Sequence, residues 1–208
     1  MGRFRFLAGV LSLFMIVQAA APGAEGAEAA TANPSQVVAR FHDGLLDIMK
    51  NAQTLGVKGR YESLAPSIKQ SFHLRLMVQV AAGSYWKKGS PEQIEKLVQA
   101  FTRLSISTYA SQFDGFSGQS FETRGEKPGP QKTTLVETRI IDPGSDPVEL
   151  IYVTRLFKGQ WRIIDVLVDS GISQLAVRRS EYRQVLRTKG IDGLITTLNA
   201  KADKLLSE

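Results

Sequence analysis

The chain has 208 residues, of which 43% are hydrophobic and 22% charged, and its formal net charge is +6. This length suits one domain with a hydrophobic core, the hydrophobic content excludes a wholly disordered chain, and a mean hydropathy of -0.10 excludes a membrane protein with many spans. The absence of cysteine excludes disulfides, thiolate zinc sites, iron–sulfur clusters and thiol nucleophiles, and two histidines leave little room for a histidine-based metal site.

The start of the chain has the three-part layout of a secretory signal peptide. Two arginines begin it, residues 6–17 are almost wholly apolar, and a tract of small residues follows. A helix as long as the apolar part rises about 18 Å, well short of the roughly 30 Å hydrocarbon core of a bilayer. We therefore expect a signal peptide over residues 1–29, cut after Ala19 or Ala29, and export to the periplasm.

Removal of that segment leaves the net charge at +6, because it takes away two basic and two acidic residues. A positive exported protein can approach anionic membrane surfaces, and no nucleic-acid partner is expected for it. Local basic clusters occur at Lys87-Lys88, Arg178-Arg179 and Arg183. These clusters are either a solvated surface that aids solubility or a docking surface for anionic headgroups.

Helical periodicity dominates the first half of the remaining chain. An asparagine–proline pair offers an N-cap and a first turn, and apolar residues at helical spacing then predict an amphipathic helix over residues 34–51. Residues 60–82 are predicted to hold helical segments that are interrupted at Pro66. A second capping arrangement at Ser90 precedes the strongest helix of the chain, which is expected to run to about Ala110.

β-Rich sequence follows a stretch of glycine and proline over residues 114–130, in which a short strand is expected around Phe121. Three runs rich in β-branched and aromatic residues then predict strands, and the two links between them have hairpin composition. These runs are residues 133–141, 148–157 and 161–168. Consecutive strands with short links predict an antiparallel meander.

Helical spacing resumes from Ser173 and again over residues 192–206. Helices grouped apart from one run of strands predict an α+β fold. No second domain is visible, so residues 30–208 are expected to form one domain. The strands are apolar on both faces, which leaves two hypotheses: helices cover both faces of the sheet, or the sheet curls around something apolar such as a ligand cavity.

Catalytic motifs are absent from the sequence, which has no nucleophile elbow, Walker loop, dinucleotide fingerprint or paired-histidine zinc motif. His42 and Asp43 are adjacent, so on a helix they point about 100° apart and do not form an orienting pair. Asp165 and Asp169 are acid–base candidates, but we interpret the first as the partner of an arginine and the second as a turn residue. No catalytic residue, metal site or cofactor is predicted.

Five blocks of the sequence occur in an order and spacing that point to a known family. They are Arg60-Tyr61 with Leu64-Ala65-Pro66, then Phe72 through Met77 to Gly83 and Trp86, Phe101 to Tyr109-Ala110, Trp161 to Val166 continuing to Gly171-Ile172-Ser173, and Tyr182-Arg183 to Gly190 through Ile195. Together they resemble the MlaC-type periplasmic lipid-shuttle family, also called the toluene-tolerance auxiliary family, from about Pro34 to Leu206.

Three further segments, residues 41–50, 113–118 and 173–182, are similar to the hopanoid-associated branch of that family, HpnM. The resemblance implies a helical layer packed on a twisted antiparallel sheet, with an apolar pocket between them for lipid tails. The implied cargo is a phospholipid, or a hopanoid in the HpnM branch. The implied partners are a lipid transporter in the inner membrane and a lipid complex in the outer membrane.

The residues expected to line this pocket are apolar residues on predicted helices and strands. They are Leu45, Ile48, Met49, Met77, Phe101 and Leu104 from helices, with Val136, Ile151, Val153 and Ile163 from strands. The inward residue of the second strand stays open between Ile151 and Tyr152, because a shift of one residue inverts a strand. Two other functions remain as alternatives: a hydrolase or isomerase that uses Asp165 and a histidine, or an adaptor with a solid core.

Overall fold

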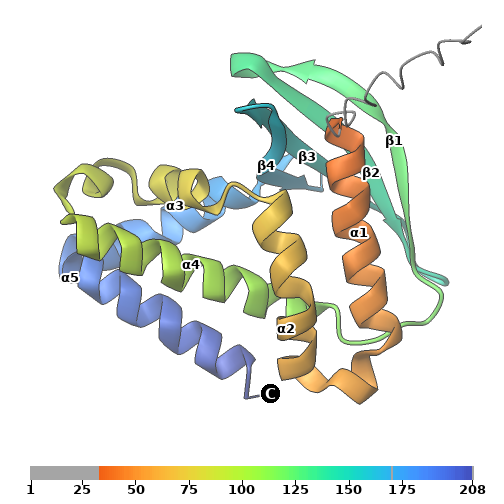
Figure 1. The fold of residues 1–208 in the computed structure, drawn as a ribbon, viewed down its shortest axis with the longest axis horizontal. Coiled ribbons are helices and arrows are strands. Elements are labelled where there is room, and N and C mark those ends of the chain that lie inside the picture. Colours follow the sequence, from red (N-terminus) through yellow and green to blue (C-terminus); the bar gives the residue numbers. More distant parts are fainter. Residues whose placement is uncertain (1–32, 170, 208) are drawn as a thin grey trace, which may run out of the picture. The chain divides into compact units, whose positions relative to one another are not determined.

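The computed structural model describes residues 33–169 and 171–207, and the expected signal peptide lies outside this part of the chain. The described residues form helices and one five-stranded antiparallel sheet, which confirms the α+β class (Figure 1). No helix in the described part is long and apolar enough to cross a bilayer.

The first predicted helix is confirmed as α1 (Pro34–Lys50). Its start is fixed by a capping box, in which the backbone N–H of Gln36 donates to the Asn33 side chain and the backbone N–H of Asn33 donates to the Gln36 side chain. The apolar face of α1 is buried against the sheet and α2. This helix therefore forms part of the central core.

The expected interruption at Pro66 is wrong, because α2 (Ala52–Ser71) runs through that residue. Pro66 is exposed, whereas Leu64 and Ile68 on the same helix are fully buried. Their packing outweighs the single backbone hydrogen bond that a proline removes from a helix. The real irregularity lies earlier, at Gly56, where φ is 58°.

Three helical segments follow α2 in the order α3 (Leu74–Ala82), η1 (Gly83–Lys88) and α4 (Pro91–Gln112). The last of these confirms the predicted long helix, and its start at Ser90 carries a second capping box with Gln93. The segment η1 is a 3-10 helix with no buried residue. It therefore lies at the surface of the molecule.

The strands form a meander in which each strand pairs with the next in the chain. They are β1 (Ser120–Gly129), β2 (Thr133–Ile141), β3 (Val148–Phe157), β4 (Gln160–Val168) and β5 (Ile172–Ser173). The three predicted strands and the antiparallel meander are confirmed. The expected short strand around Phe121 is instead a ten-residue edge strand, with a bulge between Thr123 and Gly125.

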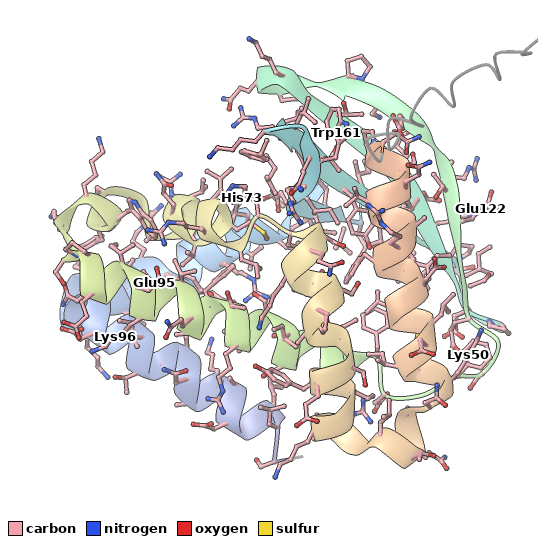
Figure 2. All side chains as sticks on the ribbon, viewed as in Figure 1. Lys50, His73, Glu95, Lys96, Glu122 and Trp161 are labelled. Carbon is pink, nitrogen blue, oxygen red and sulfur yellow. The ribbon has the colours of Figure 1, made fainter. Side chains whose placement is uncertain are left out.

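The two faces of the sheet differ in burial. Val136, Tyr152 and Val166 lie opposite one another across β2, β3 and β4 and are buried. Their sequence neighbours point to the outer face and are only half-buried. The helices lie on the inner side of the sheet in Figure 1, while Glu122 lies on its outer side in Figure 2. No helix among the described residues covers the outer face, so for this part of the chain the hypothesis that helices cover both faces is wrong.

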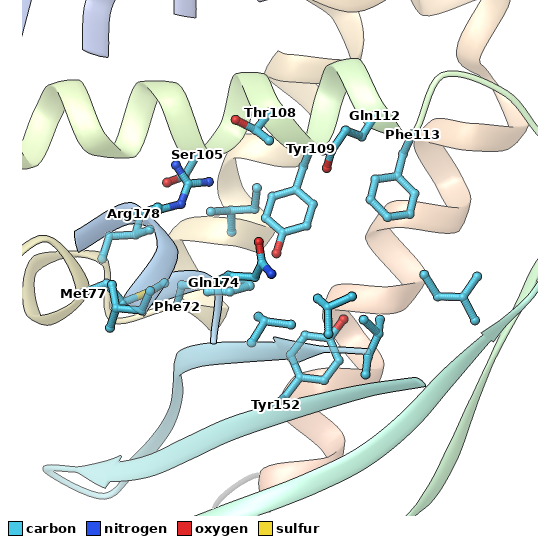
Figure 3. Close-up of a pocket in the computed structure, with 17 residues that line it drawn as sticks. Phe72, Met77, Ser105, Thr108, Tyr109, Gln112, Phe113, Tyr152, Gln174 and Arg178 are labelled. Carbon is cyan, nitrogen blue, oxygen red and sulfur yellow. The ribbon is translucent and has the colours of Figure 1, made fainter. Parts of the chain in front are cut away.

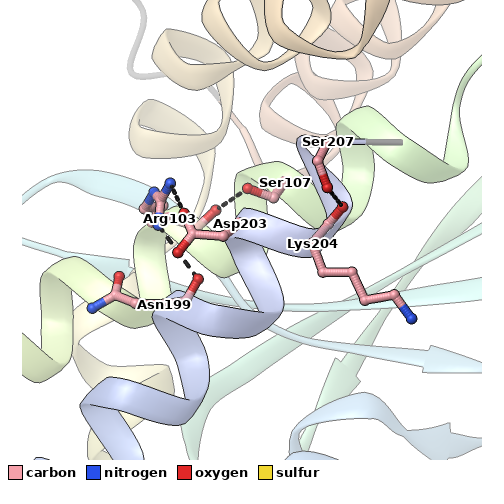
Figure 4. Close-up of polar contacts among 6 residues, drawn as sticks. All are labelled: Arg103, Ser107, Asn199, Asp203, Lys204 and Ser207. Carbon is pink, nitrogen blue, oxygen red and sulfur yellow. Dashed lines mark hydrogen bonds and ion pairs between the residues drawn. The ribbon is translucent and has the colours of Figure 1, made fainter.

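The two predicted C-terminal helices form one segment, α5 (Gln174–Leu205), which bends at Gly190, where φ is 65°. Its second half packs on α4. Arg103 of α4 donates to Asp203 at 2.6 Å and to the carbonyl of Asn199 at 3.4 Å (Figure 4). The α4–α5 pair forms a second helical layer beside α1 and α2 (Figure 1).

A buried arginine joins these helices from within. Arg60 of α2 donates through Nε to the carbonyl of Ala110 at 2.7 Å and through Nη1 to the carbonyl of Ala52 at 3.0 Å. Ala110 lies in the last turn of α4, where backbone carbonyls lack partners within the helix, and Ala52 is the first residue of α2. The guanidinium therefore ties the end of α4 to the start of α2.

Candidate functional site

A cavity of about 320 Å³ lies between the inner face of the sheet and helices α2 to α5 (Figure 3). Its apolar wall is built from both layers. The sheet contributes Ile140, Leu150, Val166 and Val168, and the helices contribute Ile68, Leu74, Met77 and Leu175. Inward side chains of three neighbouring strands thus form one side of the cavity, as the alternation of a strand requires.

Polar side chains gather along one edge of the cavity, on α4 and α5 (Figure 3). Ser105, Thr108 and Gln112 follow each other at three- and four-residue spacing, which places them on one face of α4. Gln174 and Arg178 add polar groups from the first turns of α5. The cavity is therefore amphipathic, with an apolar wall on the side of the sheet and a polar edge on α4 and α5.

Arg178 is the single charged side chain among the described residues that line the cavity. Its guanidinium carbon lies 5.7 Å from the centre of the Phe101 ring, within the range of a cation–π contact. A half-buried cation at the polar edge can bind an anionic group, such as a phosphate, by charge-assisted hydrogen bonds.

Two tyrosines bring hydroxyl groups to the same space. Burial raises the pKa of Tyr109 to about 12, although the positive charge of Arg178 partly opposes this shift. Burial also raises the pKa of Tyr152 well above its ordinary value. Both phenols are therefore neutral at physiological pH and remain able to donate hydrogen bonds.

His42 lies outside the cavity and forms a hydrogen bond with Tyr152, which lines it. Its Nε2 lies 2.9 Å from the tyrosine hydroxyl, and its ring stacks on Phe121 with centroids 4.0 Å apart. Burial lowers the pKa of His42 from 6.5 to about 3, so the imidazole stays neutral. The histidine thus acts as a structural hydrogen-bond partner that fixes a cavity residue.

The catalytic alternative requires a histidine hydrogen-bonded to a carboxylate, and no such pair occurs among the described residues. His42 pairs with the tyrosine described above, and His73 Nδ1 accepts from the backbone of Leu76 at the start of α3. The expected arginine partner of Asp165 is wrong. This carboxylate instead accepts from Ser173 Oγ at 2.5 Å and from the backbone N–H of Leu175 at 3.0 Å, and so caps α5.

The described residues also offer no metal-binding site. No group of three or more histidine, aspartate or glutamate side chains lies close enough to hold a metal ion in the described residues.

The ten residues expected to line a lipid pocket fall into four groups in the structure. Met77 lines the cavity, and Leu104 lines a groove outside it. Buried core positions hold Leu45, Ile48, Met49, Phe101, Val136 and Ile163. Ile151 and Val153 are half-buried on the outer face, because their neighbour Tyr152 takes the inward position. Contact of these residues with a lipid stays a prediction.

The polar edge was missed by reasoning from apolar periodicity alone. Its sequence signal is the set of polar residues at helical spacing, Ser105, Thr108 and Gln112, beside an apolar stripe that includes Phe101 and Leu104. Polar residues on the buried side of a helix indicate either a hydrogen-bonded core position or the wall of a polar site.

A second hollow continues from this edge toward solvent. We call it the outer groove; its volume is about 480 Å³, and it lies between α4 and the two ends of α5. Thr108, Gln174 and Arg178 line both the cavity and the outer groove. Lys201 of the outer groove pairs with Glu181 at 3.7 Å. The shared residues make the polar edge the boundary between apolar interior and solvent.

Known proteins resemble this chain in sequence and in fold. The family model described as MlaC protein matches residues 39–200. The intermembrane phospholipid transport system binding protein MlaC of Haemophilus influenzae is 31% identical over 126 residues, which are 59% of this chain and 58% of that protein. The match thus spans less than two thirds of that relative.

Among solved structures, the phospholipid-binding protein from Ralstonia solanacearum, in complex with a phospholipid at 1.53 Å resolution, has a TM-score of 0.73 to this chain. It is 21% identical in sequence, and the superposition covers 84% of this chain and 99% of that one. This likeness shows that the two chains share a fold.

Proposed function

The chain belongs to the MlaC family, and from this premise we propose that it is a carrier that binds a phospholipid with its acyl chains in the cavity. The single observation that carries the proposal is the amphipathic cavity between the sheet and the α4–α5 edge. A solid core, as the adaptor alternative requires, does not fit a cavity of about 320 Å³.

The volume of the cavity limits the free energy that an acyl chain gains by binding there. A volume of about 320 Å³ holds on the order of ten methylene groups, taking roughly 30 Å³ for each, as for a water molecule in the liquid. Burial of each methylene contributes about 0.8 kcal/mol, so the filled cavity is worth about 8 kcal/mol before the costs of ordering. Apolar burial alone therefore supports tight binding without any catalytic or ligand-specific motif.

Two acyl chains exceed this volume, so a whole phospholipid requires more room than the cavity offers. The outer groove supplies it at the polar edge, where Arg178 faces both spaces. We place the phosphate beside this guanidinium, because a cation at the boundary neutralises the phosphate while the tails stay on the apolar side. The headgroup then extends into the outer groove.

A second cargo hypothesis is a hopanoid, which rests on the three sequence segments that resemble HpnM. The aromatic side chains of Phe72, Tyr109 and Phe113 line the cavity and offer flat surfaces to a rigid ring system. Identification of the lipid bound to the purified protein distinguishes the two cargoes directly.

We further propose that residues 1–29 are a signal peptide, that residues 30–208 form the lipid-binding domain, and that the protein acts in the periplasm. The relative from Haemophilus influenzae is named as the binding protein of an intermembrane phospholipid transport system. By analogy, the partners proposed for this chain are a lipid transporter in the inner membrane and a lipid complex in the outer membrane.

The test compares two matched substitutions on β3. Leu150→Trp places an indole in the cavity, whereas Ile151→Trp places the same group on the outer face of the sheet. Lipids are extracted from each purified protein and from wild type and identified by mass spectrometry. We expect wild type and Ile151→Trp to carry phospholipid or hopanoid, and Leu150→Trp to carry severalfold less.

The proposal fails if purified wild type is empty and takes up neither lipid class from vesicles. It also fails if Leu150→Trp retains as much lipid as Ile151→Trp while both proteins unfold at the same temperature as wild type.

A further inference from the structure

We propose that the surface formed by η1 and the first half of α5 docks on a bilayer that contains acidic phospholipids. This inference goes beyond the carrier function, because it concerns where the protein meets a membrane and not what fills its cavity. We call the surface the basic tip. It consists of Tyr85, Trp86, Lys87, Lys88, Arg179 and Arg183.

The basic tip is built around two hollows beside η1. One, of about 300 Å³, is bordered by Val80, Trp86 and Lys87, and the other, of about 90 Å³, is bordered by Tyr85 and Arg183. Arg179 and Gly83 border both hollows. No acidic residue lines either of them within the described chain.

The cations of the basic tip are available for an external partner. Lys87, Lys88, Arg179 and Arg183 are exposed, and none of them forms an ion pair with a described residue. By contrast, Arg103 of α4 is paired with Asp203. Four unpaired positive charges around one 3-10 helix attract an anionic surface.

Aromatic residues distinguish a bilayer from an acidic protein as the partner. Lys88 Nζ lies 4.8 Å from the centre of the Tyr85 ring, and Arg75 Cζ lies 5.6 Å from that of Trp86. Tryptophan and tyrosine concentrate at the headgroup level of membranes, next to lysine and arginine. Val80 is 40% exposed beside them and adds apolar surface of the kind that enters this layer.

The position of the basic tip connects docking to cargo. Helix α3 separates the two sites: Leu74 and Met77 line the cavity, whereas Leu76 and Val80 line the larger hollow of the tip. On α5, Arg178 reaches the cavity and Arg179 the tip. A bilayer bound at the tip thus lies one helix away from the lipid-binding cavity.

The experiment measures partition of the purified protein onto vesicles by co-sedimentation. One set of vesicles is pure phosphatidylcholine, and the other is phosphatidylcholine and phosphatidylglycerol in equal parts. The tip variant combines Lys87→Gln, Lys88→Gln and Arg183→Gln. A matched control, Arg40→Gln with Lys58→Gln and Lys69→Gln, removes the same charge from exposed positions on α1 and α2.

We expect wild type to bind the acidic vesicles and not the neutral ones, and the control variant to bind as wild type does. The tip variant should bind on the order of a hundredfold more weakly, because each basic side chain near an acidic surface contributes roughly a factor of five. In a Trp161→Phe background, the emission of Trp86 should shift to the blue on acidic vesicles only.

Equal weakening in both triple variants would overturn the proposal, because it would show that net charge alone drives binding. Failure of the wild-type protein to bind acidic vesicles would also overturn the proposal, even if the basic tip binds an acidic protein. The lipid content of each variant is measured in parallel. Empty protein that still binds acidic vesicles through the tip would contradict the carrier function and leave the docking proposal standing.

Discussion

Replacement of His42 by glutamine should make the stability of the protein less sensitive to acid. The imidazole is 4% exposed, and burial lowers its pKa from 6.5 to about 3. In the unfolded chain the same histidine takes up a proton near pH 6.5. Because the unfolded state binds this proton first, His42 stabilises the fold fully above pH 6.5 and loses that contribution as the pH falls toward 3.

The size of the effect follows from the width of this window. Each pH unit below 6.5 costs about 1.36 kcal/mol, so lowering the pH to 5 costs about 2 kcal/mol through His42 alone. In the His42→Gln variant this part of the loss should be absent. The glutamine amide does not titrate and can still form a hydrogen bond with the Tyr152 hydroxyl.

The assay is urea unfolding of delipidated protein at pH 7 and pH 5, because bound lipid would add its own stabilisation. Carboxylates that titrate in this range are common to both proteins and cancel in the comparison. We expect wild type to lose about 2 kcal/mol more than His42→Gln between the two pH values. An equal loss in both proteins would refute the assignment of His42 as a buried neutral group.

Two other substitutions test the packing of the helices. Arg60→Met should lower the free energy of unfolding by about 3 kcal/mol or more, because two buried carbonyls lose charge-assisted hydrogen bonds. Thermal unfolding measures this loss. A loss below about 1 kcal/mol would contradict the role of Arg60 in joining α2 to α4. Gly193→Ala should cost about 1–3 kcal/mol, because its Cβ would clash with Lys189 Cβ, which is attached directly to the backbone of the same helix. Gly115→Ala, whose Cβ would meet nothing within 4 Å, is the control and should leave the melting temperature nearly unchanged.

Local signals in the sequence predict much of the fold. The capping boxes at Asn33 and Ser90 involve residues three apart, so sequence alone contains them, and the starts of α1 and α4 are correct. The continuation of α2 through Pro66 depends on the burial of its neighbours against other elements. Periodicity along one segment does not contain that information.

The cavity was harder to predict from sequence for a different reason. Leu45 in the core and Leu150 at the cavity wall are both buried apolar residues, and only the arrangement of the surrounding layers separates packed from empty space. The choice between Tyr152 and Ile151 required the strand register, which a single residue inverts. Arg178 belonged to a basic cluster in the sequence, and the turn into α5 decides that it faces the cavity.

The structure of β1 also affects the tendency of the protein to aggregate. This strand lies at the edge of the sheet, where unpaired backbone groups invite another chain to add a strand. Pro128 has no N–H to donate, the bulge at Gly125 interrupts the ladder, and Lys127 places a charge on the edge. These features oppose edge-to-edge pairing, so the uncovered edge of the sheet does not offer a ready template for a strand from another copy.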